Sequence, residues 1–178
     1  QRQMCIRDSF VSILDLDALE WHASSTDSYD GNSYWCGDED LGGYLDSWIQ
    51  FLDTPEFTVP NGGTLSADMM WSIESDAGAS VAGTCTDGWD QANVQISTDD
   101  GATWALFTPD GDYPGTIYNY AFYANPLYGQ SAFVHEEDEY IESVFDMADY
   151  VDEEEVKIKF IVEMWRYQGQ GDAEYWNI

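Results

Sequence analysis

Carboxylates are the side chains with which this chain could do chemistry. Its 178 residues include 35 Asp and Glu but only 5 Lys and Arg, for a formal net charge of -30. Carboxylate oxygens can bind a calcium ion, and a pair of carboxyl groups can cleave a glycosidic bond. The composition therefore indicates metal or glycoside chemistry, with a solvated, salt-adapted surface as the simpler alternative.

Catalytic residues are not expected. A glycosidase holds two carboxyl groups about 5–5.5 Å apart for retention or about 6.5–9.5 Å for inversion. Glu74 and Glu163 stand at the ends of predicted strands and are of the required type, but acids are so abundant that pairing carries little information. His22 and His135 have no partner at a triad-like or zinc-like spacing. We therefore predict a non-enzyme, with part of an extracellular glycoside hydrolase or peptidase as the alternative.

Acidic residues gather in the loops beside the predicted strands, where they would suit a calcium ion. Calcium takes six to eight oxygen ligands from carboxylates and carbonyls. The predicted metal ligands are Asp38, Asp40, Glu74, Asp87 and Asp90. The Asp-Gly-Trp-Asp run at 87–90 lacks the ligand series of an EF-hand, so we expect a structural Ca²⁺ site of another kind, with a solvated acidic face as the alternative.

The scarcity of basic residues excludes two classes of partner. Binding to nucleic acid or to an anionic membrane needs clustered Lys and Arg, which this chain lacks. No apolar run reaches the length of a membrane-spanning helix. Neighbouring domains of the same polypeptide, polysaccharide and a cell-surface glycan are partners that this charge does not exclude.

Two cysteines remain once the first nine residues are set aside. Met4 to Ser9 reads as the translation of a common transposase-end sequencing adapter, with a genuine basic leader as the alternative. We therefore treat residues 1–9 as an artefact and residues 10–178 as one domain. An even pair of cysteines in an exported domain favours a Cys36–Cys85 disulfide, with two free thiols as the alternative.

Alternating apolar residues predict β-strands. Residues 65–74 carry apolar side chains at strict period two, and residues 156–162 also alternate. Residues 93–98 alternate as well, and Asp99-Asp100-Gly101 then predicts a tight turn into a returning strand over residues 103–107. Val94, Ile96 and Trp104 are expected to face the core. Short strands with regular turn signals predict an all-β fold, an antiparallel β-sandwich.

Tyrosines gather in the loops after the hairpin. The rings predicted to stack on sugars are Tyr113, Tyr118, Tyr120 and Tyr123. Aromatic faces bind the apolar C–H surface of sugar rings. The alternative is that these tyrosines cover the end of the sandwich, and this alternative is favoured.

The run V-x-I-S-T-D-x-G-x-T-W at 94–104 resembles a strand pair of secreted bacterial β-sandwich modules. These are the MAM-like jelly-roll domains that accompany immune inhibitor A-like peptidases. L-D-T-P-x-F, M-x-W-x-I-E, F-D-M-A-x-Y and V-K-I-K-F occur in the order of that family, within residues 48–162. The resemblance implies a jelly-roll sandwich, truncated at its C-terminal strand. It also implies a structural calcium and an extracellular, non-catalytic accessory or adhesion role in substrate targeting or interdomain packing, with a calcium-dependent carbohydrate-binding module as the alternative.

Overall fold

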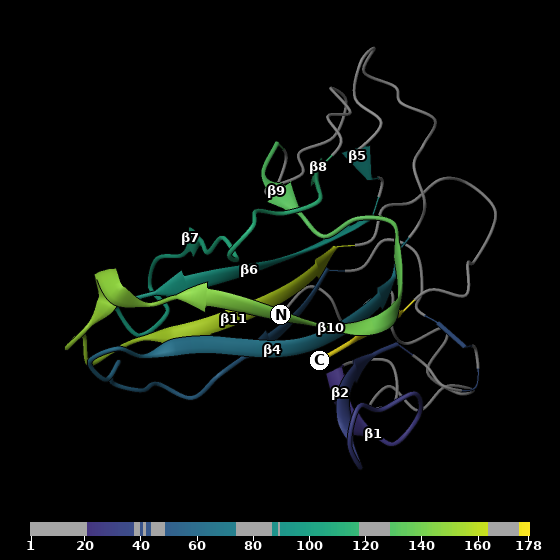
Figure 1. Cartoon of the computed structure of the whole chain (residues 1–178), viewed down its shortest axis with the longest axis horizontal. Coiled ribbons are helices and arrows are strands. Elements are labelled where there is room, and N and C mark those ends of the chain that lie inside the picture. Colours follow the sequence, from purple (N-terminus) through teal and green to yellow (C-terminus); the bar gives the residue numbers. More distant parts are fainter. Residues whose placement is uncertain are drawn as a thin grey trace, which may run out of the picture.

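The chain folds into an antiparallel β-sandwich in a computed structural model (Figure 1). The structure describes residues 21–37, 40, 42–43, 49–73, 87–88, 90–117, 129–163 and 175–178. The predicted all-β, antiparallel sandwich is confirmed. The strands are β1 Trp21–Ser24, β2 Ser33–Cys36, β3 Ile49–Asp53, β4 Thr64–Ser72, β5 Asp87–Gly88, β6 Gln91–Ser97, β7 Ala105–Leu106, β8 Gly115–Ile117, β9 Ser131–Ala132, β10 Glu136–Asp146, β11 Lys157–Glu163 and β12 Tyr175–Asn177.

Two antiparallel sheets form the layers of the sandwich. One has the order β1-β2-β12-β4-β10 and the other the order β3-β11-β6-β7. A small third sheet, β5-β8-β9, stands beside them and contains the parallel pair β5–β8 (Figure 1). Among the described residues, no helix is long and apolar enough to cross a membrane.

Alternating side chains of both sheets fill the core. On β4, Met69 and Trp71 are buried, and on β11 Ile158 and Phe160 face them across the sandwich. This is the period-two pattern that predicted both strands. A short 3-10 helix, Ala148–Tyr150, follows β10.

The longest strand begins with a run of acidic residues. Residues 136–139 form the first part of β10, which extends over Glu136–Asp146. The pairing with β4 shifts register between Glu137 and Ile141, so the acidic side chains lie on an irregular part of the strand. Because the β10–β4 pairing is interrupted there, residues 136–139 lack the alternation of a regular strand.

The hairpin between β6 and β7 has the predicted tight turn. Asp100 and Gly101 both adopt positive φ, at 55° and 87°. The Ser97 hydroxyl accepts a hydrogen bond from the Gly101 amide at 2.9 Å and donates one to Asp99 Oδ1 at 2.7 Å. Asp99 also accepts from the Thr103 amide at 2.8 Å and the Thr103 hydroxyl at 2.6 Å. These bonds, those from Thr103 first, lower the pKa of Asp99 to about 2.

The lowered pKa predicts how the turn responds to acid. A carboxylate whose pKa falls on folding stabilises the fold above its unfolded pKa of about 3.9, and that contribution disappears as the pH falls through the folded value. We expect Asp99→Ala to lower the melting temperature at about pH 6 and to lower it less as the pH drops from about 4 to 2. Thermal unfolding of both proteins across this range tests this, and a constant difference would contradict it.

Candidate binding surface

The outer face of the four-stranded sheet brings an exposed aromatic ring, a half-buried one and a lysine together. β11 is flanked by β3 and β6, and Lys159 lies opposite Asp53 on one side and Gln95 on the other. Opposite residues of an antiparallel pair project to the same face. The next outward position on β3 is Phe51, which is 48% exposed. The sheet therefore displays Phe51, Asp53 and Lys159 side by side.

Lys159 lies between two aromatic rings. Its Nζ atom is 4.7 Å from the ring centroid of Phe51 and 4.0 Å from that of Trp104. It is also 3.7 Å from Asp53 Oδ1. Cation–π attraction and the carboxylate thus hold the ammonium group over the sheet. We call Phe51, Lys159 and Trp104 the aromatic strip.

The turn at the end of β6 supports one end of the aromatic strip. A Cβ atom built on Gly101 would lie 3.2 Å from Trp104 Cζ2, so the indole packs closely on the turn backbone. Trp104 is half-buried rather than a core residue, which corrects the expectation that it faces the core with Val94 and Ile96. Trp104 does not follow the alternation of a strand, because it precedes β7, which begins at Ala105.

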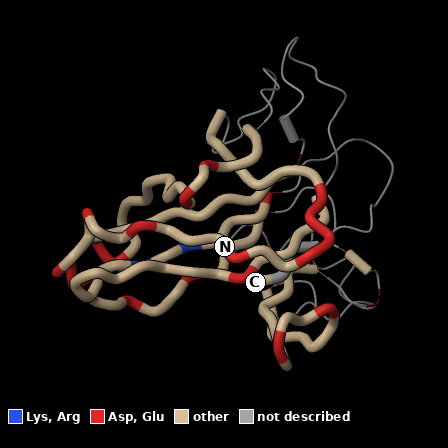
Figure 2. Tube along the Cα trace, viewed as in Figure 1, with Lys and Arg blue, Asp and Glu red and all other residues tan. Residues whose placement is uncertain are grey.

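Positive charge is concentrated at this face. Lys157 and Lys159 are the only Lys or Arg in the parts of the chain that the structure describes, and Figure 2 shows them in blue on β11. Lys157 Nζ is 2.5 Å from Asp100 Oδ1. The hydrogen bond with Asp100 raises the pKa of Lys157. Each lysine is thus paired with an aspartate.

Tyr113 is not available to a ligand, contrary to the sequence expectation. Its side chain is buried at 8% exposure, and its ring packs 4.8 Å from that of Phe133. The hydroxyl donates to the Phe107 carbonyl at 2.7 Å and accepts from the Val94 amide at 2.9 Å. Burial raises the pKa of this phenol. The Pro/Gly/Asp-rich surroundings suggested a surface loop, but the polar tip allows the ring to enter the core.

Removing the hydroxyl of Tyr113 tests this structural role. We expect Tyr113→Phe to lower the free energy of unfolding by about 1–3 kcal/mol, because the Val94 amide and the Phe107 carbonyl lose a buried partner. Tyr34→Phe is the matched control, since Tyr34 is 53% exposed and should change stability little. Urea unfolding of the three proteins measures the difference. Equal stabilities would show that the Tyr113 bonds contribute nothing.

The remaining predicted aromatic ligands, Tyr118, Tyr120 and Tyr123, lie outside the described residues. So do the predicted metal ligands Asp38 and Glu74, and the side chain of Asp87. Of the other two, Asp40 is exposed and Asp90 is buried at 3% exposure. Within the described residues, no three Asp, Glu, His or Cys side chains come together as a metal site. The structural calcium therefore stays a prediction.

Two buried amide side chains on β6, Gln91 and Asn93, were not among the predicted site residues. Gln91 and Asn93 are 1% and 0% exposed, although the alternation of residues 93–98 placed Asn93 on the face opposite Val94 and Ile96. Gln91 Nε2 donates to Glu163 Oε2, and Asn93 Nδ2 donates to Gln130 Oε1 at 3.0 Å. Gln91 Oε1 and Asn93 Oδ1 have no hydrogen-bond partner. Such acceptors suit a buried water or a hard cation.

Cys36 is a free thiol at 0% exposure, and Cys85 lies outside the described residues, so the predicted disulfide is not part of the described structure. Burial raises the pKa of the Cys36 thiol.

We expect Cys36 to resist alkylation at about pH 8 in the folded protein and to react in urea without reductant, because the thiolate is the nucleophile. Mass spectrometry of the labelled peptide measures this. A Cys36 that reacts only after reduction would instead establish the disulfide.

No model of a known protein family matches this chain, and no curated protein matches it. The outer face of the β3-β11-β6-β7 sheet carries two aromatic rings, with the ammonium group of Lys159 and the carboxylate of Asp53 beside them. Such a surface can stack against a ligand and exchange hydrogen bonds with it.

Proposed function

We propose that the chain is a non-catalytic accessory module of a secreted or cell-surface protein, which targets that protein to a polysaccharide. The observation that carries the proposal is the aromatic strip on the outer face of the β3-β11-β6-β7 sheet. An exposed aromatic surface is the feature expected of a binding module, whereas an enzyme requires a cleft with two carboxyl groups in distinct environments.

The chemistry of the strip favours uncharged sugars. Sugar rings have apolar C–H faces that can cover the exposed face of Phe51 and the accessible part of Trp104. Lys159 can donate to a sugar hydroxyl and Asp53 can accept from one, since both lie beside the rings. The lysines are matched by Asp53 and Asp100, and the net charge of -30 repels polyanions at low salt. A neutral glycan is not repelled by this net charge and does not need an unpaired lysine.

Packing against a neighbouring domain of the same polypeptide is the second candidate function. Ile49 and Phe51 on β3 are 37% and 48% exposed, and such an apolar pair could also be covered by protein. A calcium-dependent version of glycan binding is tested in the same experiment, because the amide oxygens of Gln91 and Asn93 lie on β6, next to β11, and the buried Asp90 directly precedes β6.

The test is affinity electrophoresis of the whole chain through gels that contain neutral or sulfated polysaccharides, in calcium and in chelator. We expect saturable retardation by at least one neutral polysaccharide, and loss of that retardation in Trp104→Ala but not in Tyr34→Ala. Retardation that also requires calcium would support the calcium-dependent version. A folded protein that is retarded by none of the gels would overturn the glycan proposal and favour packing against a domain.

A further inference from the structure

A glutamine side chain stands at the border of the aromatic strip. Gln130, which directly precedes β9, accepts hydrogen bonds at Oε1 from Asn93 Nδ2 at 3.0 Å and from Gln95 Nε2 at 3.5 Å. Gln95 lies opposite Lys159 in the pairing of β6 with β11. Because opposite residues of an antiparallel pair project to the same face, the Gln130 side chain lies over the outer face of the sheet, one strand away from Lys159.

The two hydrogen bonds fix the orientation of the Gln130 amide. Both end on Oε1, so the amide oxygen faces β6 and the NH2 group is left for another partner. Gln130 is partly exposed, and in the described parts of the chain its Nε2 atom has no hydrogen-bond partner. Asn93 and Gln95 are 0% and 8% exposed, so two buried side chains hold the amide in place before a ligand binds.

Hydrogen-bond donors gather beside the rings of the aromatic strip. Lys159 Nζ, 4.0 Å from the ring centroid of Trp104, carries three N–H donors and accepts nothing. The indole Nε1 of Trp104 is also a donor only, and it has no hydrogen-bond partner within the part of the chain that the structure describes. Asp53 is an acceptor, but it lies 3.7 Å from Lys159 Nζ and is paired with it. A ligand on the strip therefore meets donors of three side chains, those of Lys159, Trp104 and Gln130.

These donors favour a ligand with a strong, uncharged acceptor. A carbonyl oxygen only accepts, whereas a sugar hydroxyl also carries a donor, which costs free energy if it is covered without a partner. The net charge of -30 disfavours carboxylate and sulfate groups as the acceptor. The acetamido group of an N-acetylated amino sugar meets both conditions. Its methyl group can also cover part of the Phe51 ring, which is 48% exposed.

We propose that the aromatic strip binds a glycan that contains N-acetylated amino sugars, and that Gln130 Nε2 donates to the acetamido carbonyl oxygen. The inference rests on the proposed function and adds the chemical class of the sugar and a residue that selects it. Asn93 and Gln95 are positioning residues in this arrangement, because they orient the Gln130 amide from below. A glycan with hydroxyl groups in place of the acetamido groups can stack on the same rings but gives Gln130 a weaker acceptor.

Isothermal titration of the whole chain with two matched ligands tests the proposal. One is a short β-1,4-linked oligosaccharide of N-acetylglucosamine, and the other is the glucose oligosaccharide of the same linkage and length, which differs only at C2. We expect the acetylated ligand to bind about tenfold more tightly. Gln130→Glu keeps an oxygen acceptor for Asn93 and Gln95 but removes the NH2 donor, so it should abolish this preference. Urea unfolding checks that the variant is folded.

The ratio of the two affinities separates recognition from a structural role. If Gln130 only held the fold of this face, Gln130→Glu would weaken both ligands in proportion, and an unchanged ratio would overturn the assignment of Gln130. Equal affinities of the unaltered chain for the two ligands would overturn the acetamido preference and leave the glycan proposal standing.

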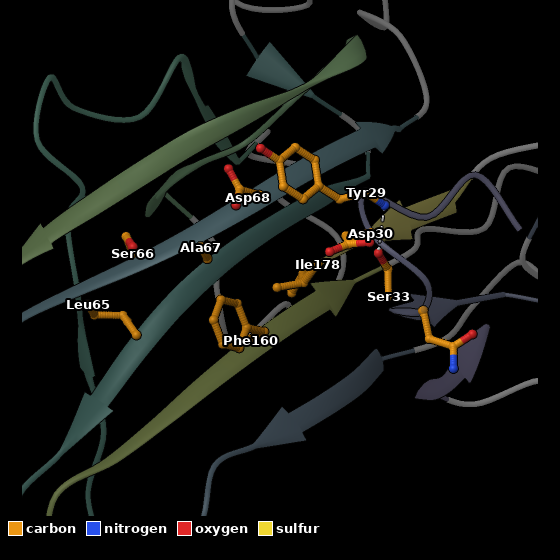
Figure 3. A pocket seen from close by; sticks show the side chains of 10 residues that line it. Tyr29, Asp30, Ser33, Leu65, Ser66, Ala67, Asp68, Phe160 and Ile178 are labelled. Carbon is orange, nitrogen blue, oxygen red and sulfur yellow. Dashed lines mark hydrogen bonds between the residues drawn. The ribbon is translucent and has the colours of Figure 1, made fainter. Parts of the chain in front are cut away.

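A second exposed ring serves as the control for the place of binding. Figure 3 shows Tyr29 at a cavity of about 330 Å³ beside β4, on the other sheet, and Tyr29 is 63% exposed. Tyr29→Ala should leave the affinity for the acetylated ligand unchanged, and a loss as large as that in Trp104→Ala would overturn the inference. If neither ligand bound to a chain that another neutral polysaccharide retards, only the acetamido preference would be overturned. If no gel retarded the chain either, the glycan proposal would fail with it.

Discussion

Phe145→Ala is expected to lower the free energy of unfolding by about 3–5 kcal/mol. Phe145 is 0% exposed, and its ring lies 5.0 Å from that of Phe107. It sits on β10 opposite Leu65 of β4, so its ring joins the edge of one sheet to the segment that follows β7 of the other. Removing the ring leaves a cavity, because the core side chains that surround Phe145 can move only partly into the empty space.

Phe51→Ala is the matched control for this loss. Phe51 is 48% exposed on β3, so the same truncation should cost less than about 1 kcal/mol there. Urea unfolding, with the slope of the transition checked for each protein, measures both changes. A similar loss at the two positions would contradict the assignment of Phe145 to the core and of Phe51 to the surface.

Trp104→Ala is expected to weaken glycan binding by about 10-fold or more. Aromatic stacking contributes roughly 0.5–1.5 kcal/mol beyond the burial of apolar area, and 1.4 kcal/mol corresponds to a factor of about ten in affinity. Phe51→Ala should weaken binding in the same direction. Lys159→Met keeps the aliphatic stem between the rings but removes the ammonium group, so its effect should be smaller.

Tyr34→Ala is the control for the binding series, because Tyr34 is an exposed aromatic residue on β2 of the other sheet. Isothermal titration with the best-retained oligosaccharide gives the affinities, and urea unfolding confirms that each variant is folded. If Tyr34→Ala weakened binding as much as Trp104→Ala, the aromatic strip would not be the binding surface.

The strands could be predicted because their side chains repeat with the period of the pleat. Residues 65–74 and 156–162 have one apolar face each, and the structure has β4 over Thr64–Ser72 and β11 over Lys157–Glu163. The hairpin followed from Asp99-Asp100-Gly101, where a local turn decides the conformation. The first part of β10 could not be predicted, because its acidic residues show no alternation and its pairing is set by β4.

The candidate site could not be predicted because it depends on contacts between distant strands. Phe51, Trp104 and Lys159 come from three separate segments, and the register of β3 with β11 brings the first and last together. Tyr113 was misplaced for a related reason: its burial depends on a hydrogen bond to Phe107 and on the Phe133 ring, neither of which local sequence reveals. The sequence placed the candidate aromatic ligands in the loops after the hairpin, with tyrosines that cover the end of the sandwich as the favoured alternative.

The most direct test of the proposed function is an NMR titration of the isotope-labelled chain with a short oligosaccharide of the retained polysaccharide. We expect the largest chemical-shift changes at the Trp104 indole N–H and at the backbone amides of β3, β7 and β11 around Phe51 and Lys159. The changes should saturate and should vanish in Trp104→Ala. Saturable shifts confined to β1, β2 or β10, with the Trp104 indole unchanged, would contradict the proposal that the aromatic strip binds the glycan.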